Sequence, residues 1–337
     1  MKVLYVGSSK GTSLHRCLAL QRLGHHVETI DTFEAISNIP FARAWSFRTG
    51  AFGLSTIVAS YLERQIGKKR YDVALIDGGE LIAPAAVFRL KENVGVVACY
   101  NCDNPFVAWD YRRWRLFRES LPFYDLFVTP RQSNVESAHQ VGAQKVIRVD
   151  FAADEIAHRP QPLGPIDYER FGADVVFIGQ WMPERGPFLY RLLKKGVPLK
   201  VFGPRWHKAP EYSAIKAHVS PDFLAGNDYS KAVQCAKIAI GLLSKGNEDL
   251  HTTRSLEIPA LGALFCGERT VDHLRMYRDG KEAVFWDDAD ECAAHCLSLL
   301  KNPGRIKSIA SAGHRRVHEN KAFNEPLMAR IMREAIA

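Results

Sequence analysis

The chain has 337 residues, of which 47% are hydrophobic and 24% are charged, a composition that excludes a disordered or fibrous protein. Its formal net charge of +8 favours anionic partners, such as phosphorylated small molecules or an anionic lipid surface. The seven cysteines are scattered and odd in number, which argues against a disulfide framework and indicates reduced thiols in a cytoplasmic protein.

The first half of the chain alternates short apolar runs with segments of helical length. It opens directly on a strand pattern, without the apolar stretch of a secretion signal, and no membrane-spanning helix is expected. Apolar runs separated by helices are typical of parallel strands covered on both faces. We therefore expect a doubly wound, Rossmann-like α/β domain over residues 1–157. Its strands are predicted at residues 2–6, 27–30, 73–76, 94–99, 126–128 and 146–149, and its first helix at residues 13–24.

Residues 158–172 interrupt this alternation with three prolines and two glycines and are predicted to form a linker. The alternation then restarts, so a second Rossmann-like α/β domain is expected over residues 173–321. Two such domains predict a central cleft beyond the carboxyl ends of their strands, where open α/β sheets bind ligands. The second set of strands is predicted at residues 175–178, 199–202, 238–243, 263–266 and 283–286, with a helix at residues 187–195.

A glycine-rich turn follows the first predicted strand and leads into a helix. Gly7, Gly11 and Thr12 can bind an anion near the cleft, or the glycines can simply let the chain turn. The spacing differs from the GxGxxG pattern of dinucleotide enzymes. No nicotinamide cofactor is therefore expected, although Asp31 ends the second strand, where such enzymes bind a ribose.

An arginine-rich segment interleaved with aromatic residues lies between the fourth and fifth predicted strands. Two interpretations stay open: an amphipathic helix with a solvated basic face, or a surface that faces an acceptor or a membrane. Just before it, Cys99 and Cys102 form a CxxC without a second pair, so no metal site is expected. The segment contains Arg112, Arg113, Arg115 and Arg118 together with Trp109, Tyr111, Trp114 and Phe117.

The first strand of the second half leads through Gly179 to a helix that carries Arg185 near its start. An arginine at this position can bind a phosphate through two parallel hydrogen bonds, which a lysine cannot do. The other interpretation is a surface arginine at the start of a helix.

The segment HTTRSLEIPALG follows a later strand after a short polar loop. Thr252 and Thr253 suit a helix cap, and Pro259 is expected early in that helix. A pyrophosphate there would gain from backbone amides, hydroxyl groups, the helix dipole and Arg254. Glu257 lies on an otherwise apolar helix and needs a partner, either vicinal ribose hydroxyls or a neighbouring basic residue.

The string RSLEIPALGAL, followed by DGKEAVFWDD and a terminal helix, resembles the donor domain of group-1 glycosyltransferases. The nearest branch is the spore-maturation, CgeB-like one. The strings FIG with Arg185, and VFG before Arg205 and Trp206, are also similar to that branch, so the likeness covers residues 174–320. In the first half, NCDNP resembles the Asp-x-Pro turn of the branch.

This resemblance implies a GT-B fold, in which two Rossmann-like domains face each other. The C-terminal domain would bind a nucleoside diphosphate sugar and the N-terminal domain the acceptor, and a final helix over residues 322–337 would cross back to the first domain. If the roles known in the family hold at the matching positions, Glu257 would bind ribose, and Arg185 and Arg254 would bind the diphosphate. The implied donor-binding residues are Gly179, Arg185, Gly203, Trp206, Thr252, Thr253, Arg254 and Glu257.

The sequence departs from the wider family at one acid. The family has two glutamates separated by seven residues, whereas here Asp249, beside Glu248, stands at the position eight residues before Glu257. The usual contact of the first acid with the donor sugar, and retaining chemistry, therefore do not follow from the resemblance.

We expect a metal-independent hexosyltransferase that moves a sugar from a nucleoside diphosphate to an acceptor hydroxyl, without a cofactor. Fixed positive charge would stabilise the leaving diphosphate. In an inverting reaction Asp103 is the expected catalytic base, because it follows a strand end, although it can instead cap the turn before Pro105. Asp31 and His15 are further candidates.

Several questions of function stay open at the level of sequence. The acceptor can be a glycan, a lipid-linked molecule, a protein or a small molecule, with peripheral contact at the inner membrane face. No nucleic-acid partner is expected, since no known motif supports one. The alternatives are a nucleotide-sugar epimerase of the same fold and a non-catalytic nucleotide- or sugar-binding protein.

Overall fold

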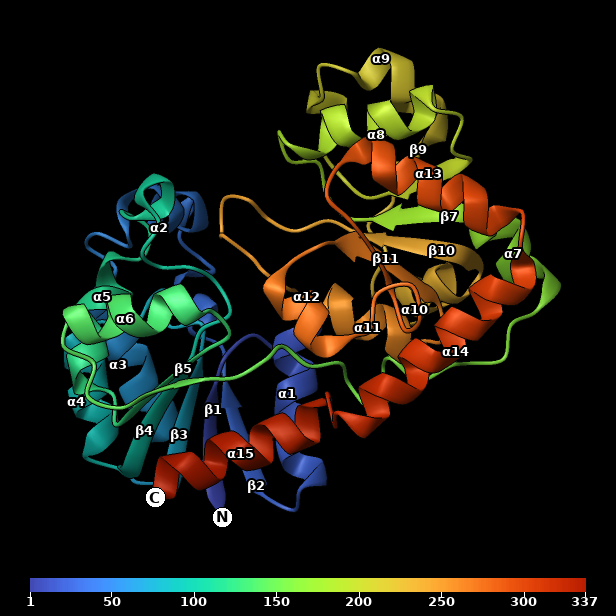
Figure 1. Ribbon diagram of the computed structural model, residues 1–337. Helices are drawn as coiled ribbons and strands as arrows, with labels where there is room; N and C mark the ends of the chain where they lie inside the picture. Colours follow the sequence, from blue (N-terminus) through green and yellow to red (C-terminus); the bar gives the residue numbers. More distant parts are fainter. The chain divides into compact units, whose positions relative to one another are not determined.

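The computed structural model describes all residues from Met1 to Ala337 and consists of two compact units (Figure 1). Unit 1 comprises Met1–Phe151 and Asn324–Ala337, and unit 2 comprises Ala152–Phe323. Each unit contains one six-stranded sheet whose neighbouring strands all run parallel. The predicted pair of doubly wound α/β domains is therefore confirmed.

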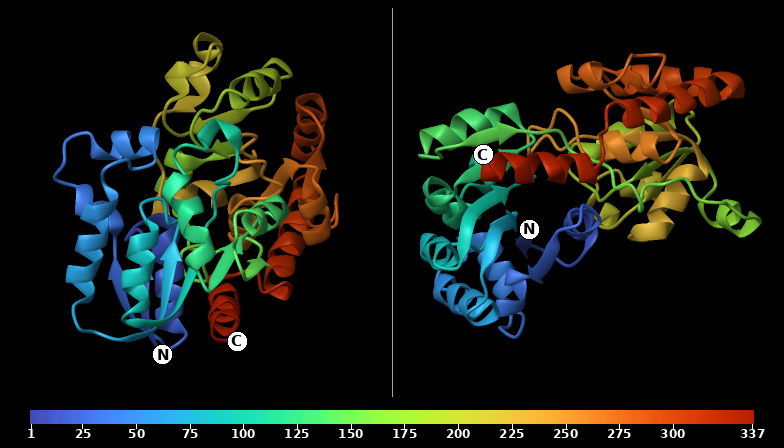
Figure 2. Two further views of the ribbon diagram at one scale, coloured as in Figure 1. Left: turned by 90° about the vertical axis from the view of Figure 1, so that its left-hand side faces the viewer. Right: turned by 90° about the horizontal axis from the view of Figure 1, so that it is seen from below.

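Unit 1 forms the six strands expected from its apolar runs, each within two residues of the predicted bounds. The side chains of the four inner strands are largely buried because helices cover both faces of the sheet, whereas the two edge strands are mostly half-buried or exposed (Figure 2). In chain order the elements are β1 (Lys2–Val6), α1 (Gly11–Arg22), β2 (His26–Ile30), η1 (Thr32–Ile36), α2 (Ala42–Thr49), α3 (Ser55–Ile66), β3 (Tyr71–Asp77), α4 (Pro84–Lys91), β4 (Val94–Tyr100), η2 (Ala108–Asp110), α5 (Arg115–Ser120), η3 (Leu121–Phe123), β5 (Leu126–Thr129), α6 (Gln132–Gln140), β6 (Val146–Arg148) and, from the end of the chain, α15 (Asn324–Ile336).

The strand order of unit 1, β2-β1-β3-β4-β5-β6, explains why the last helix of the chain belongs to this unit. Right-handed crossovers place α1 on one face and the helices that lead from β2 towards β6 on the other. Helix α1 covers only part of its face. Helix α15 packs beside α1 and against β4 and β5, and buries Leu327, Met328, Ile331 and Met332 there.

Unit 2 also forms its predicted strands within two residues, together with a short additional edge strand, β9. The predicted linker contains a helix, α7, whose start is fixed by Pro165 at its first turn and by the Asp167 carboxylate accepting from the Gly164 amide at 2.9 Å. The elements are α7 (Pro165–Phe171), β7 (Ala173–Ile178), α8 (Arg185–Lys194), β8 (Leu199–Phe202), η4 (Trp206–Lys208), α9 (Tyr212–Ile215), η5 (Lys216–His218), β9 (Val219–Ser220), α10 (Gly226–Gln234), β10 (Ala236–Gly241), α11 (Arg254–Ala260), β11 (Leu264–Glu268), α12 (Val271–Met276), β12 (Val284–Trp286), α13 (Ala289–Leu300) and α14 (Pro303–Glu319).

The strand order of unit 2, β12-β11-β10-β7-β8-β9, reverses direction between β7 and β10. Helix α13 packs beside α8, and α14 packs beside α11, so both faces of the sheet are covered. In sheets of this kind the two strands at the reversal point diverge into loops on opposite faces, which leaves a crevice beyond their carboxyl ends. The carboxyl ends of β7 and β10 are therefore the place to look for a ligand site.

Candidate functional site

A cavity of about 320 Å³ lies at this reversal point in unit 2. Its wall comes from the carboxyl ends of β7, β8 and β10, the start of α8, a loop before α10, and the residues that lead into α11. This is a typical place and size for a small-molecule site. The lining residues are Phe177, Ile178, Gly179, Gln180, Met182, Arg185, Phe202, Gly203, Pro204, Phe223, Leu224, Ile240, Gly241, Leu242, Ser244, Asp249, Thr252, Thr253 and Arg254.

Two predicted site residues, Gly179 and Gly203, shape the floor of the cavity. Gly203 has φ +143°, and a Cβ atom there would lie 2.2 Å from the Gly179 carbonyl oxygen. The same carbonyl accepts a hydrogen bond of 3.0 Å from the indole Nε1 of Trp206. Trp206 is only 2% exposed and packs edge-on against Phe177, with ring centroids 6.0 Å apart. Trp206 therefore supports the floor from within the core, and its part in donor binding stays a prediction.

Arg185 extends into the cavity from the start of α8 and is 9% exposed. Its Nη1 donates to the Gln180 carbonyl at 2.9 Å and its Nη2 to the Leu242 carbonyl at 3.5 Å, whereas its Nε has no partner in the protein. Burial lowers the pKa of Arg185 and neighbouring Arg254 lowers it further, whereas the carboxylates of Glu184, Asp249 and Glu268 act in the opposite direction. A buried guanidinium that faces neutral carbonyls is costly, and a bound anion would offset this cost.

Glu257 lies beneath the cavity and is 1% exposed. Its Oε2 accepts from the Tyr229 hydroxyl at 2.9 Å and from Nη1 of Arg254, and its Oε1 lies 3.6 Å from Nε2 of His158. Burial alone would raise the pKa of Glu257, but Arg254, His158 and the Tyr229 hydroxyl lower it to about 2. Of the two partners predicted for Glu257, ribose hydroxyls or a basic residue, the structure contains the basic one. Glu257 thereby holds Arg254 at the cavity wall.

Replacing Glu257 by glutamine is expected to lower the free energy of unfolding at pH 7 by about 3 kcal/mol, because it leaves Arg254 without its buried partner. The folded pKa of about 2 lies below the usual 4.5. The ionised carboxylate therefore stabilises the fold above pH 4.5, and this contribution is lost as pH falls towards 2. Denaturant titrations from pH 7 to pH 3 should show that the wild type loses more stability than the variant. Glu169→Gln, at an exposed position in the same unit, is the control, and an equal loss in both variants would contradict this role.

Helix α11 begins at the cavity and continues through a proline. Thr252 and Thr253 line the cavity, and Thr253 is the N-cap but makes no side-chain capping bond. Pro259 lies in the interior of this short helix, so its predicted place early in the helix was wrong. The proline cannot donate to the Ser255 carbonyl, and the Tyr277 hydroxyl donates to that carbonyl instead, at 2.7 Å. A tyrosine distant in the sequence thus compensates for the proline.

Asp249, which stands where the wider family has its first glutamate, lines the cavity. Its Oδ2 accepts from the Ser244 amide at 3.4 Å, which ties the loop after β10 back to the strand end. Neighbouring Glu248 is exposed and has φ +54°. Asp249 was not among the predicted site residues. Its place shortly before α11 could have indicated that it lines the cavity.

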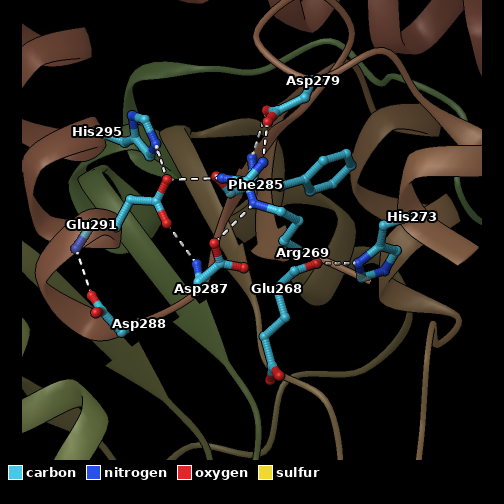
Figure 3. A network of polar contacts seen from close by, with 9 residues as sticks. All are labelled: Glu268, Arg269, His273, Asp279, Phe285, Asp287, Asp288, Glu291 and His295. Atoms are coloured by element: carbon cyan, nitrogen blue, oxygen red, sulfur yellow. Dashed lines mark hydrogen bonds and ion pairs between the residues drawn. The ribbon is translucent and has the colours of Figure 1, made fainter. Parts of the chain in front are cut away.

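A polar network joins the loop after β11 to the DGKEAVFWDD string, residues 279–288, which contains β12 (Figure 3). At its centre Arg269 donates to Asp279, to Asp287 at 3.2 Å, to the Phe285 carbonyl at 3.0 Å and to Glu291 at 2.8 Å. These carboxylates raise the pKa of Arg269, and the hydrogen bond to Asp279 has the largest effect. This part of the family-like motif therefore has a structural role here, in holding the end of the sheet.

The glycine-rich turn of unit 1 closes over a buried ion pair. Arg16 donates from Nε and Nη2 to Asp77 at 2.9 and 3.0 Å, and the Tyr5 hydroxyl donates to the same carboxylate. A Cβ atom on Gly7 would lie 2.8 Å from Tyr5, so this glycine is required by packing. Gly11, with φ +59°, and Thr12 begin α1, and an anion at this turn stays a prediction.

Asp103 follows β4 in a turn whose backbone is held by two buried asparagines. Asn101 Oδ1 accepts from the Asp103 amide at 2.8 Å, and Asn134 Nδ2 donates to the Asp103 carbonyl at 3.1 Å. Asn104 Oδ1 accepts from the Phe106 amide at 3.2 Å and so caps the turn around Pro105. Of the further candidates, Asp31 caps η1 by accepting from the Phe33 amide at 2.9 Å, and His15 lies within α1.

The arginine-rich segment does not form one amphipathic helix, as one interpretation held. It forms a short 3-10 turn, η2, and the six-residue helix α5. Trp114, Phe117 and Arg118 are buried, whereas Trp109 and Tyr111 are exposed. The aromatic residues are thus divided between the core and the surface, because the chain changes direction between the two elements.

One cluster of thiols could supply metal ligands, although the sequence did not single it out. The Sγ atoms of Cys266, Cys292 and Cys296 lie within 4.8 Å of one another, and all three residues are buried in the core of unit 2. Binding a metal would place thiolate charge among aliphatic side chains, which is costly. Neutral thiols that pack as small apolar residues account for the cluster.

No helix of the structure has the length and apolar character needed to span a bilayer.

The residues of this cavity lie in or near a region that is similar to a known protein family. Residues 185–331 match the model of the glycosyl transferase-like family, and the matched region starts at the arginine in the cavity. No curated protein matches the sequence. Sucrose-phosphate synthase from Thermosynechococcus elongatus is structurally similar, with a TM-score of 0.70 and 11% identity over 99% of this chain and 98% of that one.

Two further solved structures are similar over nearly the whole chain. The Anabaena protein HepE in complex with UDP has a TM-score of 0.67 and 11% identity, covering 100% of this chain and 99% of that one. A putative UDP-N-acetylglucosamine 2-epimerase from Listeria monocytogenes has a TM-score of 0.60 and 13% identity, covering 98% and 94%. The predicted GT-B fold is confirmed by these likenesses.

Proposed function

We propose that this chain, with its GT-B fold and its match to the glycosyl transferase-like family, is a nucleotide-sugar-dependent glycosyltransferase. The observation that carries the proposal is Arg185, a buried cation at the reversal point of the unit 2 sheet whose protein partners are neutral carbonyls. A bound anion would supply the directly contacting negative charge that these carbonyl groups do not provide. A nucleoside diphosphate sugar provides such an anion at the right scale for the cavity.

In the proposed reaction an acceptor hydroxyl attacks the anomeric carbon of the donor sugar. The bond between that carbon and the diphosphate oxygen breaks, and the nucleoside diphosphate leaves with the electron pair. Arg185 and Arg254 would stabilise the developing negative charge without a metal, because they are held in place before the reaction begins. Thr252 and Thr253 would add hydroxyl contacts to the phosphates. Glu257 would act by positioning Arg254.

We further propose that the donor is a UDP-hexose and that unit 1 binds the acceptor. The UDP complex of HepE and its complex with UDP-glucose support this choice of donor class. The likeness of the donor-domain strings to the CgeB-like branch supports the same general chemistry. The acceptor would be a glycan, a lipid-linked molecule, a protein or a small molecule that presents a hydroxyl group.

A thermal-shift panel of UDP, GDP, ADP and dTDP, each with a matching sugar nucleotide, tests the donor site. We expect UDP at about 100 times its Kd to raise the melting temperature by about 5 °C, from the usual linkage between binding and stability. The other nucleotides should give smaller shifts. An unchanged melting temperature with every nucleotide would rule out the donor site.

A nucleotide-sugar epimerase is the second candidate, because a putative epimerase has a similar fold. The two activities differ in their need for an acceptor. NMR spectra of UDP-sugars incubated with the protein alone should stay unchanged for a transferase. Conversion of the donor sugar to its epimer without release of UDP would favour the epimerase.

A further inference from the structure

Six large aromatic side chains lie on the surface of unit 1 in two segments, residues 41–52 and 109–111. Each is between 48% and 88% exposed. Exposed apolar groups gathered in one region of a protein mark an interaction site, whereas single exposed aromatics are ordinary. The aromatic surface, as it is called below, comprises Phe41, Trp45, Phe47, Phe52, Trp109 and Tyr111.

The two segments form one continuous surface, although more than 50 residues separate them in the sequence. They follow the carboxyl ends of β2 and β4, which lie at the same edge of a parallel sheet. A Cβ atom on Gly50 would lie 2.2 Å from the Arg112 carbonyl oxygen, so the backbones touch. The Arg113 guanidinium lies 4.8 Å from the ring centre of Phe47, and a hollow of about 670 Å³ is lined by both segments.

The local structure holds these side chains outward. Helix α2 buries only Ala42 and Ser46, which leaves its aromatic residues on the solvent side. Trp45 Nε1 donates to the Phe52 carbonyl at 2.9 Å, which closes the turn after the helix. Phe41 and Ala51, at the two ends of α2, have φ values of +60° and +57°, a conformation that costs free energy for residues with a side chain.

Positive charge borders the aromatic surface, and only part of it is matched by acids. Arg113 pairs with Glu80, and Arg115 pairs with Glu119. In contrast, Arg48 and Arg112 are exposed and form no ion pair, and Arg43 is in contact only with the ring of Phe33, at 5.3 Å. The surface therefore combines aromatic groups with unpaired arginines, and its chemistry is complementary to an anionic headgroup layer.

We propose that the aromatic surface and its arginines bind the interface of a bilayer rich in anionic phospholipid. The aromatic rings would enter the headgroup region, and Arg43, Arg48 and Arg112 would contact lipid phosphates. Since no helix can span a bilayer, attachment would be peripheral. This proposal does not depend on the transferase activity, because lipid binding needs neither donor nor acceptor.

Co-sedimentation of the full chain with vesicles tests the proposal. We expect the protein to bind vesicles of phosphatidylcholine with one third phosphatidylglycerol at least tenfold more strongly than vesicles of phosphatidylcholine alone, as roughly tenfold or larger electrostatic effects are usual. Arg48→Gln with Arg112→Gln should reduce binding to the anionic vesicles about 30-fold, the factor for two basic side chains near such a surface. Lys301→Gln with Lys307→Gln removes the same charge from exposed positions of unit 2 and should have little effect.

The aromatic contribution is tested separately with Phe41→Ser and Phe52→Ser, the most exposed pair of the surface. We expect binding to anionic vesicles to fall about tenfold. The control is Ile166→Ser with Tyr168→Ser, which removes exposed apolar groups from unit 2. Melting temperatures close to that of the wild type would show that these variants fold.

Lipids with brominated acyl chains report insertion directly. They should quench fluorescence of the wild type, and the quenching should be lost in Trp45→Phe with Trp109→Phe. The proposal would be overturned if the wild type did not bind anionic vesicles. It would also be overturned if variants of the aromatic surface and its arginines lost no more vesicle binding than the control variants. Variants of the aromatic surface could instead keep vesicle binding but lose sugar transfer to a water-soluble acceptor. The surface would then be an acceptor site, and the membrane proposal would be wrong.

Discussion

Arg185→Ala is expected to lower the rate of sugar transfer about 1000-fold, as is usual when a fixed group that stabilises leaving-group charge is removed. The affinity for UDP should fall with it. Arg185→Lys should recover little of the rate, because a lysine cannot donate two parallel hydrogen bonds to a phosphate. Release of UDP gives the rate, and isothermal titration with UDP gives the affinity.

The stability of the Arg185 variant distinguishes a ligand-binding role from a structural one. Arg185 is buried and its hydrogen-bond partners in the protein are neutral carbonyls, so its removal should leave the melting temperature of the free protein unchanged or raised. Arg191→Ala is the matched control on the same helix, where it breaks an exposed ion pair with Asp290 and should leave UDP binding intact. A large loss of stability together with normal UDP affinity would show that Arg185 serves the fold.

Asp103→Asn is expected to lower transfer by about 100-fold or more while UDP affinity stays unchanged, which is the usual effect of removing a general base. We propose that Asp103 takes the proton of the acceptor hydroxyl in an inverting reaction. The two asparagines that hold its backbone fix the start of its side chain at the end of β4, and asparagine at this position keeps the shape but cannot accept a proton. The measurement is the initial rate of UDP release in the presence of acceptor.

Two variants serve as controls for Asp103. Asp31→Asn changes an acid that caps η1, and His15→Asn changes a histidine within α1. Both residues were also candidates from the sequence, so both variants should be measured under the same conditions. Near-wild-type transfer by Asp103→Asn would show that the base lies elsewhere, and a large loss in either control would identify a better candidate.

The fold could be predicted largely because each buried parallel strand leaves a strong local signal. Continuous apolar runs such as residues 2–6 and 199–202 match the strands of the structure at both ends. Strand β9 has only two residues and no such run, so it was not predicted. The place of Pro259 was also predicted wrongly, because the Tyr277 hydroxyl that tolerates it comes from a later element.

The candidate site was predictable where a residue and its role lie in one strand-turn-helix segment. Gly179, Arg185, Gly203 and the residues before α11 are examples, and they meet because parallel strands end at one edge of the sheet. The environment of Glu257 could not be predicted, because His158 and Tyr229 reach it from distant parts of the chain. The packing of Trp206 could not be predicted for a related reason, since the sequence does not tell which face of a turn an indole packs against.

The position of α15 bears on how such proteins can change in evolution. Unit 2 is one uninterrupted stretch of chain, whereas unit 1 is completed only by residues after it. A recombination event that replaces the coding region for residues 152–323 would therefore supply a whole new unit 2 and leave unit 1 intact. A single crossover near residue 151 would instead pair the first sheet with a foreign last helix, and the buried residues of α15 would have to fit α1, β4 and β5 by chance.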